Sequence, residues 1–337
     1  MSLRDANVRW VLAGSALLGS ASGALGAFAL LRRRALLGDA LAHAALPGVC
    51  LAYLVVGGKD PLALLLGAAI TASLGTLAVG AITRYSRVKP DAALALVLSV
   101  FFGVGIALLT WIQRHPRGDA SGLDRFIFGQ AAALVPADLR LMSVLTIALC
   151  AITVALFKEF KLTSFDPAYG AALGYPVRLL EGLLAALIVL AVVVGLQAVG
   201  VVLMAAMLVI PPATARQWTD RLAVMVALSA GFGTLAAVCG TLASFFAPQL
   251  PTGPLIVLAA AAIFAVSLAF ARRRGVVASA LERARRRLRI RDENVLKTLY
   301  QLEERRTAAG REVRPRHGSH LEEIAAVRAL GPRALRR

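Results

Sequence analysis

The chain has 337 residues, of which 58% are hydrophobic and only 17% are charged. Its mean hydropathy is +0.74 and its formal net charge is +18. A soluble domain of this length carries more charge than this, so the composition argues against an ordinary soluble enzyme or binding module. It favours a membrane protein built from apolar helices.

Apolar runs of about 18 residues or more are long enough to cross a bilayer as helices. They fall at roughly 11–31, 36–57, 61–83, 92–111, 139–157, 180–213, 222–247 and 253–271. The first run is expected to span the membrane, with a cleaved signal peptide as the alternative. The run 180–213 is long enough to turn back, and Gly195 and Gly200 are where it can break. The sequence therefore predicts an all-α, polytopic membrane helical bundle with about eight or nine crossings.

Basic residues cluster in alternate connections between these runs. The clusters are Arg32–Arg34, Arg84–Lys89, Lys158–Arg178, Arg216–Arg221 and Arg272–Arg274. Because Lys and Arg are enriched in cytoplasmic loops, we expect these connections to face the cytoplasm and the N-terminus to face outward. The connection 113–138 is then external, although it too contains basic residues.

The stretch 38–48 (GDALAHAALPG) places a carboxylate and an imidazole four residues apart at the start of the second run. Residues i and i+4 share a helix face, and ionisable groups at membrane depth usually mark a substrate or ion path. Asp39 and His43 are therefore candidate ligands for Mn²⁺ or Fe²⁺, and Zn²⁺ is not excluded. Alternatively, Asp39 is the N-cap of this helix and His43 a structural histidine. Pro47 is expected to bend the helix.

Four stretches resemble, in order, motifs of the ABC-3 family, the membrane permease subunits of bacterial ABC importers for manganese, zinc or iron. They are 38–48, 164–177 (SFDPAYGAALGYPV), 197–216 (QAVGVVLMAAMLVIPPATAR) and 250–254 (LPTGP). The resemblance implies a type II importer permease in the inner (cytoplasmic) membrane, with lipid around it. It also implies pairing with a second copy or a paralogue, an ATPase subunit below, and an extracytoplasmic metal-binding protein above. The metal is then cargo held in passing by Asp39 and His43, and no cofactor is permanently bound.

The resemblance places the region that couples to the ATPase at the end of the third stretch. Its residues are Pro211, Pro212, Ala213, Thr214, Ala215 and Arg216. The sequence by itself predicts that the two prolines end a helix and that a short basic segment follows, with an ordinary kinked loop as the alternative. The sequence has no P-loop motif, so the chain is expected to be a transport subunit without enzymatic activity of its own. A gradient-driven metal ion carrier or channel is the alternative function.

Residues 272–337 differ in composition from the permease domain expected over 1–271. They contain 19 Lys and Arg against 8 Asp and Glu. The spacing of apolar residues predicts a helix over 283–304, and 292–304 (DENVLKTLYQLEE) resembles the first helix of metal-dependent winged-helix repressors. We expect a partial winged-helix remnant in a basic cytoplasmic tail that packs as a helical pad or contacts lipid. Specific nucleic-acid binding is not expected. Such a tail favours manganese as the cargo.

Overall fold

The computed structural model describes residues 6–32, 37–58, 60–115, 136–246 and 251–271, and single positions beyond them. The chain forms two compact units, Met1–Arg273 and Arg274–Arg337. The helix expected over 283–304 and the repressor-like remnant lie largely outside the described residues, as does most of the connection 113–138.

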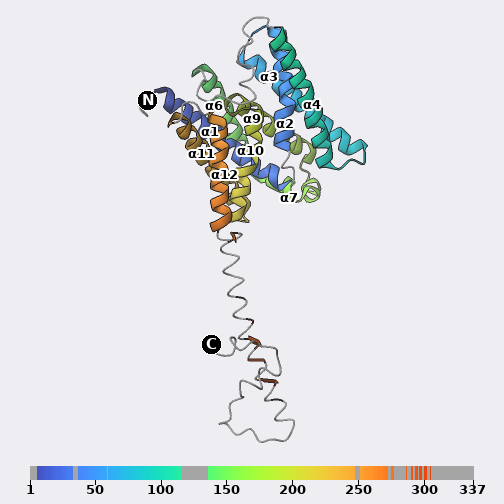
Figure 1. Cartoon of the computed structure of the whole chain (residues 1–337). Helices are drawn as coiled ribbons and strands as arrows, with labels where there is room; N and C mark the ends of the chain where they lie inside the picture. Colours follow the sequence, from blue (N-terminus) through green and yellow to red (C-terminus); the bar gives the residue numbers. More distant parts are fainter. Residues whose placement is uncertain are drawn as a thin grey trace. The chain divides into compact units, whose positions relative to one another are not determined.

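Every described element is a helix (Figure 1). The helices are α1 (Ala6–Leu31), α2 (Leu37–Val56), α3 (Pro61–Tyr85), α4 (Pro90–Arg114), α6 (Pro136–Ala155), α7 (Phe157–Phe165), α8 (Pro167–Ala172), α9 (Val177–Val199), α10 (Val201–Trp218), α11 (Leu222–Phe246) and α12 (Thr252–Phe270). Among the described residues, seven helices are long and apolar enough to cross a membrane, or eight if the bent α6–α7 pair counts as one span. The predicted all-α, polytopic bundle is confirmed; of the two counts, eight lies within the expected range of eight or nine crossings and seven lies below it.

The long apolar run 180–213 is divided at Gly200, one of the two positions where the sequence allowed a break. Gly200 has φ +88°, in the left-handed region that glycine adopts without steric cost. A side chain at Gly195 would collide with the side chain of Met204, so the two helices pack closely beside the break. From there α10 contacts α1, α2, α11 and α12 as well as α9.

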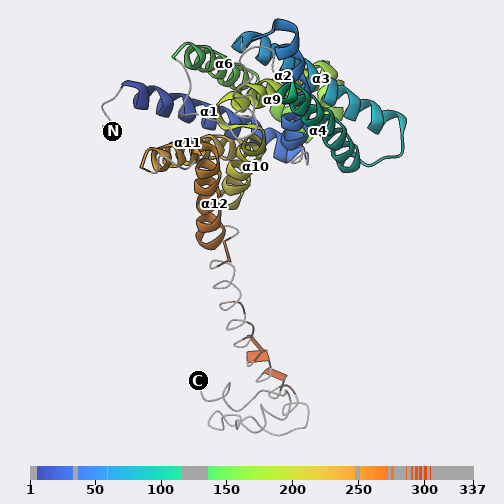
Figure 2. The same cartoon turned by 45° about the horizontal axis from the view of Figure 1, so that its top comes forward.

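The helices of the first unit form two neighbouring groups that share α9 and α10. In one group α2 packs against α3 and α4, and in the other α1 packs against α10 and α11, with α12 beside them (Figures 1 and 2). Leu25 and Phe28 of α1 are fully buried in this core. Helix α1 is therefore an integral part of the bundle, which speaks against its removal as a signal peptide.

Small residues let the helix backbones approach closely where they cross. A side chain at Gly23 would collide with the backbone of Ser229, and the Ser229 hydroxyl donates a 2.6 Å hydrogen bond to the Gly23 carbonyl. At Gly48 of α2 and Gly67 of α3, a side chain on either glycine would likewise collide with the backbone of the other. Close packing and interhelical hydrogen bonds of this kind replace the hydrophobic drive that is missing between helices in lipid.

The end of α1 is tied to α7 and α9 by polar contacts. The Arg32 guanidinium donates a 3.2 Å hydrogen bond to the Thr163 hydroxyl and lies 3.4 Å from a Glu181 carboxylate oxygen. One turn earlier, the Phe28 ring packs edge-on against Phe160 at 5.9 Å. The bent α6–α7 segment is therefore anchored to two membrane helices.

The α1–α11 crossing makes a prediction that a second glycine controls. Gly23→Ala should lower the thermal unfolding midpoint of the purified protein in detergent, because overpacking costs about 1–3 kcal/mol. Gly231→Ala, on α11, adds the same methyl group where no atom lies within 4 Å. Since both changes raise helix propensity equally, equal unfolding midpoints for the two variants would contradict the close crossing.

Candidate functional site

Asp39 and His43 lie together on one face of α2, as their spacing predicts. His43 Nε2 is 3.2 Å from Asp39 Oδ1. Helix α2 begins at Leu37, so Asp39 stands inside the first turn and not at the N-cap, where its charge still favours the helix start. Pro47 lies within α2, which continues to Val56.

The histidine of this pair is enclosed, whereas the carboxylate is accessible. The His43 side chain is 14% exposed and that of Asp39 is 38% exposed. The His43 ring packs against the Phe102 ring of α4 with centroids 4.6 Å apart and an interplanar angle of 75°. Its Nδ1 atom is buried and has no hydrogen-bond partner among the described residues. Phe102 and the Asp39 contact therefore orient the ring and present Nε2 toward the carboxylate.

The prediction that Pro211 and Pro212 end a helix is wrong, because α10 continues through both prolines to Trp218. Proline at 212 removes the N–H that the Leu208 carbonyl would otherwise accept. That carbonyl lies against Gly26 of α1, where any side chain would collide with it. The glycine therefore lets the backbone of α1 pack closely against the freed oxygen.

The end of α10 exposes only part of the predicted coupling region. Pro211, Pro212, Thr214 and Ala215 are buried, Ala213 is half-buried and Arg216 is exposed. Ala215 packs beside Ala27 and Met225. Trp218, two residues beyond Arg216, is 39% exposed. A partner protein docking here would meet the last turn of α10 and not the two prolines.

The family assignment rests on most of the chain. Residues 4–271 match the model of the "ABC 3 transport family". The chain belongs to this family. With seven apolar helices long enough to cross a bilayer among its described residues, this ABC-3 chain is a multi-pass protein of the cell membrane.

Known relatives agree with this assignment over similar lengths. The chain is 50% identical to "Manganese transport system membrane protein MntC" of Bacillus subtilis, over 89% of this chain and 69% of that protein. It is 43% identical to "Zinc transport system membrane protein TroC" of Treponema pallidum, over 81% of this chain and 92% of that protein. The solved structure "PsaBC from Streptococcus pneumoniae in complex with Fab" matches 80% of this chain and 94% of its own with a TM-score of 0.71 and 31% identity.

Three features of this ABC-3 chain are not predicted by its sequence. Phe102 covers His43 from α4, and Arg32 reaches α7, but the sequence carries no signal for contacts between such distant positions. The third is the contact of Leu208 with Gly38, beside Asp39. Among the described residues no group of three or more His, Cys, Asp or Glu side chains is placed to hold a metal, and Asp39 and His43 stand there as a pair.

Proposed function

We propose that this chain is the permease subunit of an ATP-driven importer that carries a divalent transition metal into the cytoplasm, manganese first and then zinc or iron. The observation that supports the proposal most directly is the Asp39–His43 pair, a carboxylate and an imidazole 3.2 Å apart near the start of a membrane helix. Manganese and zinc follow from the relatives, a 50% identical protein named for manganese transport and a 43% identical one named for zinc transport, and iron from the chemistry of the carboxylate and imidazole.

The spacing of the two donor atoms suits a metal ion. Nitrogen and oxygen ligands lie about 2.1 Å from such a metal, so neighbouring donors are about 3.0 Å apart at a right angle and about 3.4 Å apart at a tetrahedral angle. The 3.2 Å between His43 Nε2 and Asp39 Oδ1 lies between these values. A metal can therefore take the place of the direct contact while the two donor atoms keep about their present separation. Carboxylate with imidazole suits manganese and iron, and tolerates zinc.

The site needs more ligands than the described residues of one protomer supply. A second permease copy or a paralogue, related by an axis near Asp39, completes it with a second pair. The accessible carboxylate of Asp39 fits this arrangement, because it can reach a shared ion while Phe102 covers His43. The further partners are an ATPase subunit on the cytoplasmic side and an extracytoplasmic metal-binding protein that delivers the ion.

In this proposal the ATPase subunit docks on the exposed end of α10. Helix α10 then links the ATPase to Asp39 and His43, called the metal pair below. Arg216 and Trp218 are exposed at its end, and eight residues earlier the side chain of Leu208 packs on Gly38. At 1.5 Å per residue, Arg216 and Leu208 are about 12 Å apart along the helix. Movement of the docked end of α10 therefore reaches the turn of α2 that carries Asp39.

The metal pair is tested by uptake into vesicles that hold the permease, its ATPase and its binding protein. Asp39→Ala and His43→Ala should each reduce ATP-dependent manganese uptake more than the 10–100-fold typical of losing an outer-shell partner. Asp91→Ala and His115→Ala, which remove an exposed acid and an exposed imidazole elsewhere, should transport normally. Normal uptake by both pair variants would refute the ligand assignment. Uptake that is independent of ATP would favour a gradient-driven carrier.

The docking role of α10 predicts a loss at the ATPase. Arg216→Glu should lower metal-stimulated ATP hydrolysis by the assembled complex several-fold, since it reverses an exposed charge at the proposed contact. Metal binding should persist. Arg114→Glu reverses an exposed charge at the end of α4 and should leave hydrolysis unchanged. If Arg216→Glu assembles and hydrolyses normally, the docking surface lies elsewhere, and the segment 165–177 is the next candidate.

The Leu208–Gly38 contact predicts uncoupling without loss of the motor. Leu208→Ala should keep ATP hydrolysis but lower the number of metal ions moved per ATP, because the contact with the Asp39 turn is lost. Leu149→Ala, at another fully buried leucine on α6, causes a comparable cavity away from this contact. The two variants should match in stability and differ in the ratio of transport to hydrolysis. The same ratio in both would argue against the linkage.

A further inference from the structure

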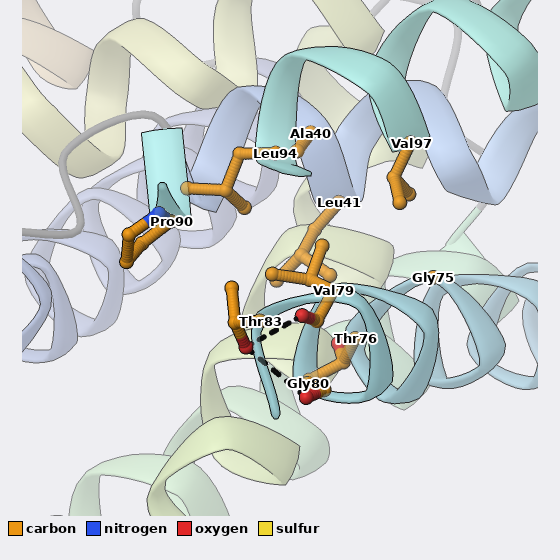
Figure 3. Close-up of a pocket in the computed structure, with 10 residues that line it drawn as sticks. All are labelled: Ala40, Leu41, Gly75, Thr76, Val79, Gly80, Thr83, Pro90, Leu94 and Val97. Atoms are coloured by element: carbon orange, nitrogen blue, oxygen red, sulfur yellow. Dashed lines mark hydrogen bonds between the residues drawn. The ribbon is translucent and has the colours of Figure 1, made fainter. Parts of the chain in front are cut away.

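A cavity of about 80 Å³ lies between α2, α3 and α4 (Figure 3). Its inner end is formed by Ala40 and Leu41 of α2 and by Leu94 and Val97 of α4, each at most 3% exposed. Its outer end lies between α3 and α4, at the exposed residues Gly80 and Pro90. The cavity therefore runs from the buried face of α2 to the surface of the bundle.

The lining of this cavity is apolar in its chemistry. Its two hydroxyl groups are already bonded within their own helix: Thr83 donates to the carbonyls of Val79 and Gly80 at 2.8 and 3.0 Å (Figure 3), and Thr76 donates to Ala72 at 3.0 Å. An engineered apolar cavity of about 150 Å³ in another protein stays dry and binds benzene. A cavity about half that size takes a few methylene groups and no whole ligand.

Three basic residues adjoin the lining residues at the outer end of the cavity. Arg84 follows Thr83, Lys89 precedes Pro90, and Arg87 lies between them; all three are exposed. In the described part of the chain none of the three is within salt-bridge distance of an acid, and Asp91 is the acidic residue next to them. Tyr85 is 82% exposed, with the Arg84 guanidinium 5.7 Å from its ring centroid.

We infer that this is a binding site for one anionic phospholipid. Arg84, Arg87 and Lys89 hold the phosphate, and part of one acyl chain enters the cavity past Gly80. Both halves of the site suit this ligand, since basic pockets between membrane helices bind anionic headgroups and tyrosine favours the membrane interface. The first turn of α4 adds the partial positive charge of a helix start. A soluble anion would use the charges alone and leave the cavity without an occupant.

The lipid would touch the helix that carries the metal pair. Ala40 and Leu41, at the inner end of the cavity, directly follow Asp39 in α2. An acyl chain in the cavity therefore packs against that turn and stabilises the α2–α3–α4 group. The binding itself does not depend on the identity of the transported ion.

Native mass spectrometry of the full-length protein tests this inference. The protein is released from vesicles of equal phosphatidylcholine and phosphatidylglycerol, and the retained lipids are counted. The wild-type protein should retain one phosphatidylglycerol per protomer. Replacing Arg84, Arg87 and Lys89 together by Gln should weaken retention about a hundredfold, since each basic residue contributes about fivefold at a membrane surface. Gly80→Leu should also lose the lipid, because its side chain fills the outer end; a Cβ at Gly80 meets no atom within 4 Å.

Two matched variants separate this site from general effects. Gly103→Leu adds the same side chain at another open glycine, on α4, and should retain the lipid. Replacing Lys158, Lys161 and Arg178 by Gln removes three exposed charges from another connection and should also retain it.

Four results would overturn the inference. The first is a wild-type protein with no preference for phosphatidylglycerol. The second is retention by Gly80→Leu, which would leave a surface charge effect without a chain in the cavity. The third is a rise in the unfolding midpoint with inorganic phosphate that equals the rise with phosphatidylglycerol. In the fourth, the Arg84, Arg87 and Lys89 variant keeps the lipid but loses the ATPase subunit, which would make this surface a protein contact.

Discussion

Close contact between helix backbones at small residues is the constraint on which this structure depends. Lipid tails are as apolar as the helices, so burial of apolar surface does not hold the bundle together. At Gly23 and Ser229 the backbones of α1 and α11 touch, and the Ser229 hydroxyl donates a 2.6 Å hydrogen bond to the Gly23 carbonyl. At Gly48 and Gly67 the backbones of α2 and α3 meet. Larger residues at these crossings would push the helices apart and remove the dispersion contacts that stabilise them.

The same constraint positions the candidate site. Helix α2 is held by α3 at Gly48, by α4 where Leu46 packs on Gly105, and by α10 where Leu208 packs on Gly38. With the helix held on these sides, the His43 ring packs edge-on against Phe102 and contacts Asp39. In the proposed role as ligands, Asp39 and His43 are preorganised by this packing, and the contacts between α2 and α10 give a route for movement from the ATPase side.

The parts of the structure that the sequence predicts are those decided within a single helix. An apolar run in lipid must be helical because its backbone groups have no other partners, and the Asp39–His43 contact follows from i,i+4 spacing. The sequence allowed a break of the run 180–213 at either of two glycines, and the chain breaks at Gly200. Other features depend on contacts between helices. Two prolines stop an isolated helix, but α10 continues through them, with α1 packed against the Leu208 carbonyl at Gly26. The contact of Phe102 with His43 and the hydrogen bond from Arg32 to Thr163 could not be predicted from the sequence, since the partners are distant along the chain.

The central claim is that Asp39 and His43 bind the ion during its passage. The most direct test is a crystal structure of the assembled permease soaked in Mn²⁺, with anomalous scattering used to locate the metal. The account predicts a peak about 2.0–2.3 Å from both His43 Nε2 and a carboxylate oxygen of Asp39, with the direct contact between the two side chains replaced by the ion. A peak elsewhere in the bundle, with His43 and Asp39 still 3.2 Å apart and bonded to each other, would contradict it.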